Sequence, residues 1–116
     1  MNTRNLVAIS IKHTAYRWKF GKPCVLWGGH RTLDGEKRCY AGYTIYPNSA
    51  ELYSLDDWAK SGYVCDWMKL DEPVKLSIDL CKKYKKYDTV LVTLEDYLAY
   101  CKLADLPLER PASEYL

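Results

Sequence analysis

One short stretch of the sequence, CVLWGGHRT from Cys24 to Thr32, combines residue types that could bind or transform a ligand. Trp27 can stack on a flat ring such as a nucleobase, and His30 and Arg31 can contact a phosphate. The glycine pair precedes a basic residue but lacks the lysine and the full glycine spacing of a phosphate-binding P-loop, so we interpret it as a β-bulge. Two nearby residues complete this candidate site, Arg38 for phosphate and Tyr40 for stacking.

Cysteine catalysis is one enzymatic possibility, because the chain holds five cysteines and two histidines. A thiolate nucleophile needs a nearby base, and a hairpin would bring His30 close to Cys39. The alternation of the second hairpin strand, however, places Cys39 on the face that we expect to be the core. We therefore predict that these two residues are not a catalytic pair.

Metal and acid–base chemistry find little support. The cysteines and histidines show no CxxC or HxxxH spacing, so the sequence predicts no metal site. The acid pairs Asp56-Asp57 and Glu95-Asp96 stand at expected helix starts, where carboxylates favour the positive end of the helix dipole. We predict no catalytic residues, no metal and no cofactor, and we favour a binding protein over an enzyme.

A second candidate surface is the basic run CKKYKKYD at 81–88. Lysines three or four positions apart on a helix share one face and repel each other, at a cost of about 0.3 kcal/mol per pair. A solvated face tolerates that cost, so the run does not by itself require a partner. Its candidate binding residues are Lys82, Lys83 and Lys86.

A predicted β-hairpin at 24–46 must position the first candidate site. Asp34-Gly35 favours a two-residue turn, because glycine accepts a positive φ without steric penalty. In the first arm, Trp27 and Arg31 lie on the face opposite to that of His30. In the second arm we expect the core face to hold Cys39, Ala41, Tyr43 and Ile45.

Other elements follow from hydrophobic periodicity and from capping residues. Ser54 with Asp57 forms a capping box, Asp79 caps a short helix, and Thr93 begins a longer one. The expected helices are 54–62, 80–87 and 93–104, separated in part by an irregular stretch at 63–72. The expected strands are 6–12, 50–53, 73–79 and the apolar 88–92, which suits a central strand, with 16–23 as a strand or an extended lip.

The expected fold is α+β. We predict a single compact domain at 1–105, built on a mostly antiparallel twisted sheet of about five or six strands. Two or three short helices pack on one side of the sheet. Residues 106–116 form a loosely held C-terminal tail, because this segment is rich in prolines and polar residues.

Length and composition fit a globular protein. The chain has 116 residues, 48% of them hydrophobic and 28% charged, which suits one domain with its own core. No segment has the roughly 18 apolar residues that span a bilayer, and the N-terminus has no secretory pattern. The odd number of cysteines is a poor disulfide framework, so we expect a cytoplasmic protein with reduced thiols and no membrane partner.

Aromatic and charged residues point to a binding surface. The chain has 11 tyrosines and 4 tryptophans but one phenylalanine, and both abundant types combine a ring with a polar group. Residues 1–46 hold eight Lys or Arg against two acids, and residues 73–92 hold five against two, whereas 47–72 and 93–116 are acidic. A positive aromatic face suits a nucleotide, nucleic acid or an acidic protein. Alternatively, the basic and acidic segments can neutralise each other's charge within the folded protein.

The segments AISIKHT, CVLWGGHRT, RCYAGYTIYP and YDTVLVTLEDYLAYCKLADLPL together resemble uncharacterised small proteins encoded by bacteriophages and prophages. The resemblance covers nearly the whole chain. It implies a compact viral protein in a bacterial host that binds and blocks a host defence protein, such as a nuclease that handles nucleic acid.

The alternatives are a binder or hydrolase of a small phosphorylated nucleotide signal, and a nucleic-acid-binding module. A nucleotide site predicts that Trp27, His30 and Arg31 converge in a concave pocket. A protein inhibitor predicts a flat or convex aromatic patch that is flanked by charges of both signs.

Overall fold

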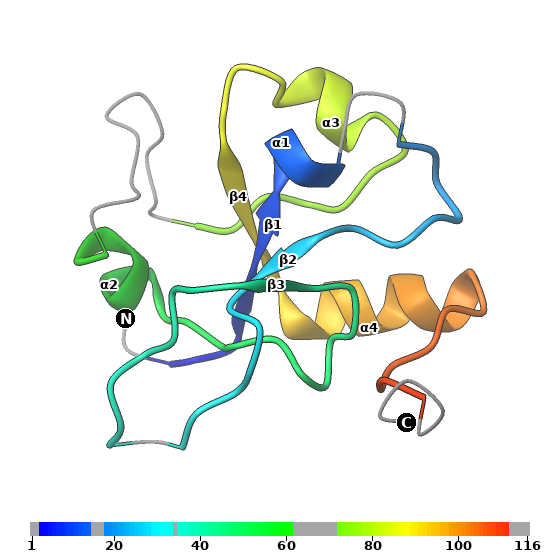
Figure 1. The fold of residues 1–116 in the computed structure, drawn as a ribbon. Helices are drawn as coiled ribbons and strands as arrows, with labels where there is room; N and C mark the ends of the chain where they lie inside the picture. Colours follow the sequence, from blue (N-terminus) through cyan, green and yellow to red (C-terminus); the bar gives the residue numbers. More distant parts are fainter. Residues whose placement is uncertain (1–2, 15–17, 34, 62–71, 112–116) are drawn as a thin grey trace.

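Two apolar segments that are far apart in the sequence pair at the centre of the molecule (Figure 1). Strand β1 (Leu6–Ser10) runs antiparallel to β4 (Thr89–Thr93) over its whole length. All five residues of β1 are buried, because other elements pack on both faces of the sheet. This pairing is therefore the framework to which the remaining elements attach.

The computed structural model describes residues 3–14, 18–33, 35–61 and 72–111. The predicted irregular stretch at 63–72 falls almost entirely outside these residues, as do Asp34 and the last five positions of the predicted tail. The remaining described elements are α1 (Ile11–Thr14), β2 (Leu26–Trp27), β3 (Tyr43–Thr44), α2 (Leu55–Ala59), α3 (Leu80–Lys83) and α4 (Leu94–Leu103).

Within the described residues the sheet has four strands in the order β3-β2-β1-β4, and every neighbouring pair is antiparallel. The protein is thus α+β, as predicted, but the expected count of five or six strands is wrong. Residues 18–23 contain no strand, and at 50–53 the pairing is limited to an isolated bridge between Tyr53 and Leu6. The segment 88–92, predicted as a central strand, lies at the end of the strand order.

The predicted strand at 73–79 is irregular for a local reason. Pro73 has no N–H to donate, and the N–H of Leu76 donates to the Asp96 carboxylate at 2.9 Å instead of to a strand. The N–H of Val74 donates to the Leu91 carbonyl at 2.9 Å. This segment consequently covers the outer edge of β4 without extending the sheet.

Residues of β1 alternate between two hydrophobic clusters. Val7 and Ile9 pack with Tyr97 of α4, whereas Leu6 and Ala8 pack with Trp58 of α2. The two helices therefore lie against opposite faces of the sheet, and the expectation that helices cover one side is wrong. A radius of gyration of 13.5 Å is that of a compact domain of this length.

The hairpin at 24–46 forms, but its register differs from the predicted one. A two-residue turn at Asp34-Gly35 would place Leu26 opposite Tyr43, whereas the structure places Leu26 opposite Thr44. A shift of one residue exchanges the two faces of a strand, so Thr44 is buried and Tyr43 is 41% exposed. The predicted core face of the second arm is therefore wrong.

The helices begin where capping residues predict. The Ser54 hydroxyl accepts from the N–H of Asp57, whose carboxylate accepts from the N–H of Ser54, and the Thr93 hydroxyl accepts from the N–H of Asp96. Helix α3 is shorter than the predicted 80–87, and Asp79 makes no capping bond. The strand predicted at 6–12 ends at Ser10, where α1 begins.

The segment after α4 runs back over the domain. The N–H of Leu106 donates to Cys101, and Leu108 accepts a bond of 3.0 Å from the N–H of Asn48. The Asn48 amide also donates to Glu109 at 3.1 Å. The start of the predicted tail is thus bonded to the domain. Among the described residues, no helix has both the length and the hydrophobicity to cross a membrane.

Candidate functional site

Three aromatic rings gather where β1, β2 and β3 meet α1. Tyr43 packs against His13 and Trp27, with ring centroids 4.3 and 4.6 Å apart. The Trp27 indole N–H donates to the Thr89 hydroxyl at 2.9 Å, and His13 Nδ1 lies 2.8 Å from the Ser10 hydroxyl. His13 and Tyr43 are exposed and Trp27 is half-buried. We call His13, Trp27 and Tyr43 the aromatic patch.

The register of the hairpin creates this patch. Because Trp27 lies opposite Tyr43, both side chains point to the same face of the sheet. Trp27 was among the predicted binding residues, whereas Tyr43 was predicted to lie in the core and His13 was not predicted. The two tyrosines of YTIYP are three positions apart and so lie on opposite faces of a strand, and only the register decides which of them is exposed.

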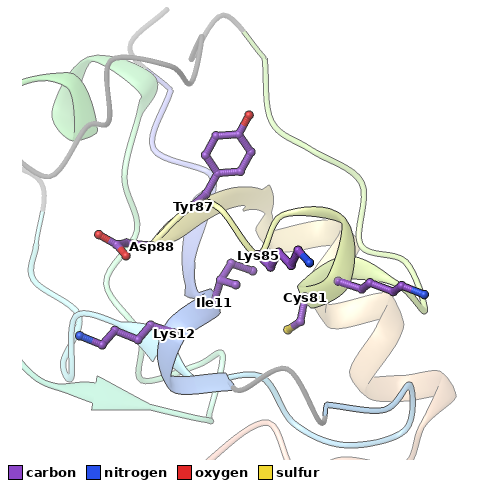
Figure 2. Close-up of a pocket in the computed structure, with 7 residues that line it drawn as sticks. Ile11, Lys12, Cys81, Lys85, Tyr87 and Asp88 are labelled. Atoms are coloured by element: carbon purple, nitrogen blue, oxygen red, sulfur yellow. The ribbon is translucent and has the colours of Figure 1, made fainter.

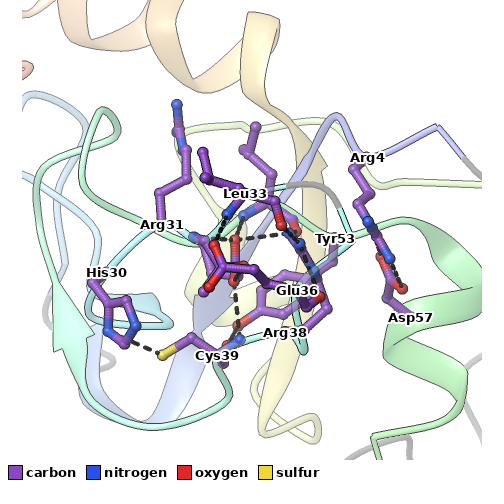
Figure 3. Close-up of polar contacts among 12 residues, drawn as sticks. Arg4, His30, Arg31, Leu33, Glu36, Arg38, Cys39, Tyr53 and Asp57 are labelled. Carbon is purple, nitrogen blue, oxygen red and sulfur yellow. Dashed lines mark hydrogen bonds and ion pairs between the residues drawn. The ribbon is translucent and has the colours of Figure 1, made fainter.

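His30 lies three residues after Trp27 of the aromatic patch, toward the turn of the hairpin. Its Nδ1 atom is 3.5 Å from Sγ of Cys39, and that sulfur also lies 3.3 Å from the Ala41 carbonyl (Figure 3). His30 is exposed and Cys39 is half-buried. The hairpin thus brings this histidine and cysteine together, and the prediction that Cys39 faces the core is wrong.

Arg31 points away from His30 and binds backbone (Figure 3). Its Nε atom donates to the Ala50 carbonyl at 3.0 Å, and Nη2 donates to the Pro47 carbonyl at 2.7 Å. Burial lowers the pKa of the guanidinium, although Glu51 acts in the opposite direction. Trp27, His30 and Arg31 therefore do not converge, and the geometry does not support a nucleotide site formed by these three residues.

Arg38 is the buried partner of Glu51. Its Nη1 atom lies 3.0 Å from the carboxylate of Glu51, a residue that is fully buried. The Nη2 atom of Arg38 donates to the Leu33 carbonyl. Burial raises the pKa of Glu51, but hydrogen bonds from Thr32, Cys39 and Leu52 together lower it below the ordinary value. Arg38 thus holds the loop together, and it is 8% exposed.

Tyr40 is likewise committed to the interior. Its hydroxyl donates to the Asp57 carbonyl at 2.7 Å, and its ring stacks on Tyr53 with centroids 5.3 Å apart. Tyr40 also packs against Trp58. Burial raises the pKa of the Tyr40 hydroxyl, and the nearby Asp57 adds to the shift. This ring links α2 to the hairpin.

The glycine pair has a structural role. The N–H groups of Gly28 and Gly29 donate to Gly42 and Ala41 at 3.1 and 3.0 Å, continuing the hairpin ladder past β2. Gly28 has a φ of +78°, and a Cβ there would lie 2.5 Å from Cβ of Glu51. Because both N–H groups are already bonded, this stretch offers them to no phosphate.

The candidate lysines on and after α3 are all exposed but differ in their surroundings. Lys82 lines a cavity between α1 and α3, whereas Lys83 lies over the Tyr84 ring at 5.5 Å. Lys86 is outside that cavity lining. In the part of the chain that the structure describes, no group of three or more His, Cys, Asp or Glu residues could hold a metal ion.

Comparison with known proteins adds no relative, since no protein-family model, no curated protein and no solved structure matches this chain.

Proposed function

We propose that this protein is a non-enzymatic binding protein and that the aromatic patch contacts its protein partner. One observation carries the proposal, the grouping of three exposed or half-exposed rings, His13, Trp27 and Tyr43, on one face. Aromatic residues are enriched among the residues that dominate binding energy at protein interfaces. The bond from Trp27 to Thr89 fixes one ring before binding, which lowers the entropy cost of association.

Charges of both signs adjoin the patch, as expected for a protein interface. Lys12 precedes His13 in the chain, and Asp88 precedes Thr89, the partner of Trp27; both charged side chains are exposed. The backbone bond from Ile11 to Asp88, of 2.9 Å, keeps these two segments adjacent. Such a mixed rim supports specificity for a partner with complementary charges.

The finer proposal rests on the resemblance to small bacteriophage and prophage proteins. It is that the partner is a host defence protein, such as a nuclease that handles nucleic acid, and that the protein blocks it stoichiometrically. A nucleic-acid-binding module is the competing use of the same rings, because exposed aromatic rings can also stack on bases.

The proposal is tested by affinity capture from bacterial lysate, with mass spectrometry of both proteins and nucleotides. The parent protein and Phe20→Ala should each recover one host protein in stoichiometric amount, whereas Tyr43→Ala and Trp27→Ala should lose it. Phe20 is a matched control, because at 39% it is almost as exposed as Tyr43 and lies outside the patch.

The recovered protein is then titrated with the parent and with each variant, and its own activity is measured. We expect the parent to inhibit it and Tyr43→Ala to weaken binding by about 2 kcal/mol. Recovery of nucleic acid without a protein, or equal binding by the parent and both patch variants, would contradict the proposal.

A further inference from the structure

A cavity of about 750 Å³ lies between α1 and α3 (Figure 2). Its volume is within the range of sites that hold small molecules. We call it the lysine pocket, and it is lined by Ile11, Lys12, Cys81, Lys82, Lys85, Tyr87 and Asp88.

The pocket carries excess positive charge. Lys12, Lys82 and Lys85 are exposed, and in the described part of the chain none of them forms an ion pair. Asp88 is the one acid in the lining. The three ammonium groups outnumber the single carboxylate of the lining, so the pocket favours a ligand that carries negative charge.

The floor of the pocket is apolar. Ile11 is 5% exposed and Cys81 is 3% exposed, and both belong to the core cluster of the domain. Burial raises the pKa of the Cys81 thiol, so this side chain is neutral at physiological pH. A ligand that fits must therefore combine an apolar body with negative charge.

Backbone hydrogen bonds hold the segments that form the walls of the pocket. The N–H of Ile11 donates to the Asp88 carbonyl at 2.9 Å, which joins the floor to the start of β4. On the other wall, the N–H of Lys83 donates to Asp79 at 2.7 Å within α3. A preformed site loses less conformational entropy on binding.

The positions of the lysines indicate how long a ligand must be to contact both sides of the pocket. In Figure 2, Lys12 and Asp88 lie on one side of Ile11 and Lys85 lies on the other. A single small anion cannot reach both sides and also cover the apolar floor. A nucleotide can do so, because its phosphates can lie at Lys85 while the polar edge of its base hydrogen-bonds to Lys12 and Asp88 on the other side (Figure 2).

We propose that the lysine pocket binds a small phosphorylated nucleotide, with the base on Ile11 and Cys81, the polar edge of the base toward Lys12 and Asp88, and the phosphates on Lys82 and Lys85 (Figure 2). This site goes beyond the proposed protein interface: it shares Lys12 and Asp88 with the rim of the aromatic patch but uses none of the three rings of the patch. Of the lysines selected from the sequence, it uses Lys82 and leaves out Lys83 and Lys86.

The test is calorimetric titration of the full chain with each of the four common nucleoside diphosphates, and with adenosine and inorganic phosphate as partial probes. At least one diphosphate should bind, and both partial probes should bind about tenfold more weakly or not at all. Lys85→Ala and Lys12→Ala should each weaken nucleotide binding by about tenfold.

Lys86→Ala is the matched control, because it removes the same charge from the same basic run outside the pocket, and it should bind as the parent does. Equal losses in Lys85→Ala and Lys86→Ala would overturn the proposal in favour of unspecific attraction. Absence of binding by every diphosphate, or tighter binding of an acidic peptide such as oligoglutamate, would also overturn it. Tyr43→Ala should keep nucleotide binding, so failure here and failure of the protein interface are distinguishable.

Discussion

At the scale of single residues, Glu51 is the most constrained charge in the described structure. Its carboxylate is fully buried and accepts from the Arg38 guanidinium, the Thr32 hydroxyl and the N–H of Cys39. A buried ion of this kind is tolerated only where its hydrogen-bonding capacity is met. Glu51 therefore organises the loop between β2 and β3.

Glu51→Gln should lower the free energy of unfolding by about 3–5 kcal/mol, because it leaves the Arg38 charge buried without its counter-ion. Glu36→Gln is the control. The Glu36 carboxylate accepts a bond of 2.8 Å from the N–H of Leu33 at an exposed site, so its loss should cost below about 1 kcal/mol. Urea denaturation measures the free energy of unfolding of each variant. Equal losses in the two variants would contradict a larger contribution from the buried ion pair.

The pH dependence of stability follows from the same carboxylate. The pKa of Glu51 in the folded protein lies below its ordinary value. The charge of Glu51 therefore stabilises the folded protein fully when the pH is above the ordinary pKa of a glutamate. That stabilisation should be lost as the pH falls from about 4 through the lower folded-state value. Glu51→Gln should lose less stability over this acid range than the parent, as urea titrations at several pH values would measure; parallel curves would contradict this assignment.

Cys39 should be the most reactive thiol among the described cysteines. Cys24, Cys81 and Cys101 are buried, and burial raises the pKa of all three. The thiol of Cys39 is half-buried, and His30 lies within reach to accept its proton.

The measurement is the rate of reaction with a disulfide reagent in a Cys65→Ser background, since Cys65 lies outside the described residues. Cys39→Ser should remove the fast phase, and His30→Ala should slow it. An unchanged fast phase in Cys39→Ser would assign the reactive thiol to another cysteine.

At the scale of elements, the hairpin depends on the close approach of Gly28 to its neighbours. A Cβ on Gly28 would lie 2.6 Å from the Tyr53 hydroxyl and 2.5 Å from Cβ of Glu51, and the backbone has a positive φ. Gly28→Ala should therefore cost about 2–5 kcal/mol of stability.

Gly29→Ala provides the matched control. The nearest atom to a Cβ on Gly29 is 3.5 Å away, which is an ordinary contact, so the cost should stay below about 1 kcal/mol. Thermal unfolding of both variants measures the difference. Similar melting temperatures for the two variants would refute the structural role of Gly28.

At the scale of the whole molecule, stability should concentrate in the β1 and β4 pair. These strands pair over five residues and are buried almost throughout, whereas β2 and β3 pair over two. Amide hydrogen exchange should be slowest in β1 and β4 and faster in β3, whose Tyr43 is exposed. Slower exchange in β3 than in β1 would contradict this order.

Local signals predicted the elements that local interactions stabilise. The capping box of α2 and the capping residue of α4 were readable because the hydrogen bonds of Ser54 and Thr93 reach three residues along the chain. The strand β4 was readable from its continuous run of apolar residues, although its partner β1 is distant in the sequence. The strand predicted at 73–79 did not form, because Pro73 has no N–H to donate and the N–H of Leu76 donates to a side-chain carboxylate.

The sequence by itself determined the α+β class, the positions of the main helices, the existence of the hairpin, and where basic and aromatic residues lie along the chain. Only the tertiary structure decided which of these residues are exposed. A register shift of one residue moved Tyr43 to the exposed face, and distant partners such as Glu51 and Asp57 engaged Arg38 and Tyr40. The lysine pocket also joins residues more than sixty positions apart. Periodicity along a chain specifies faces, whereas the pairing of distant segments determines which faces meet.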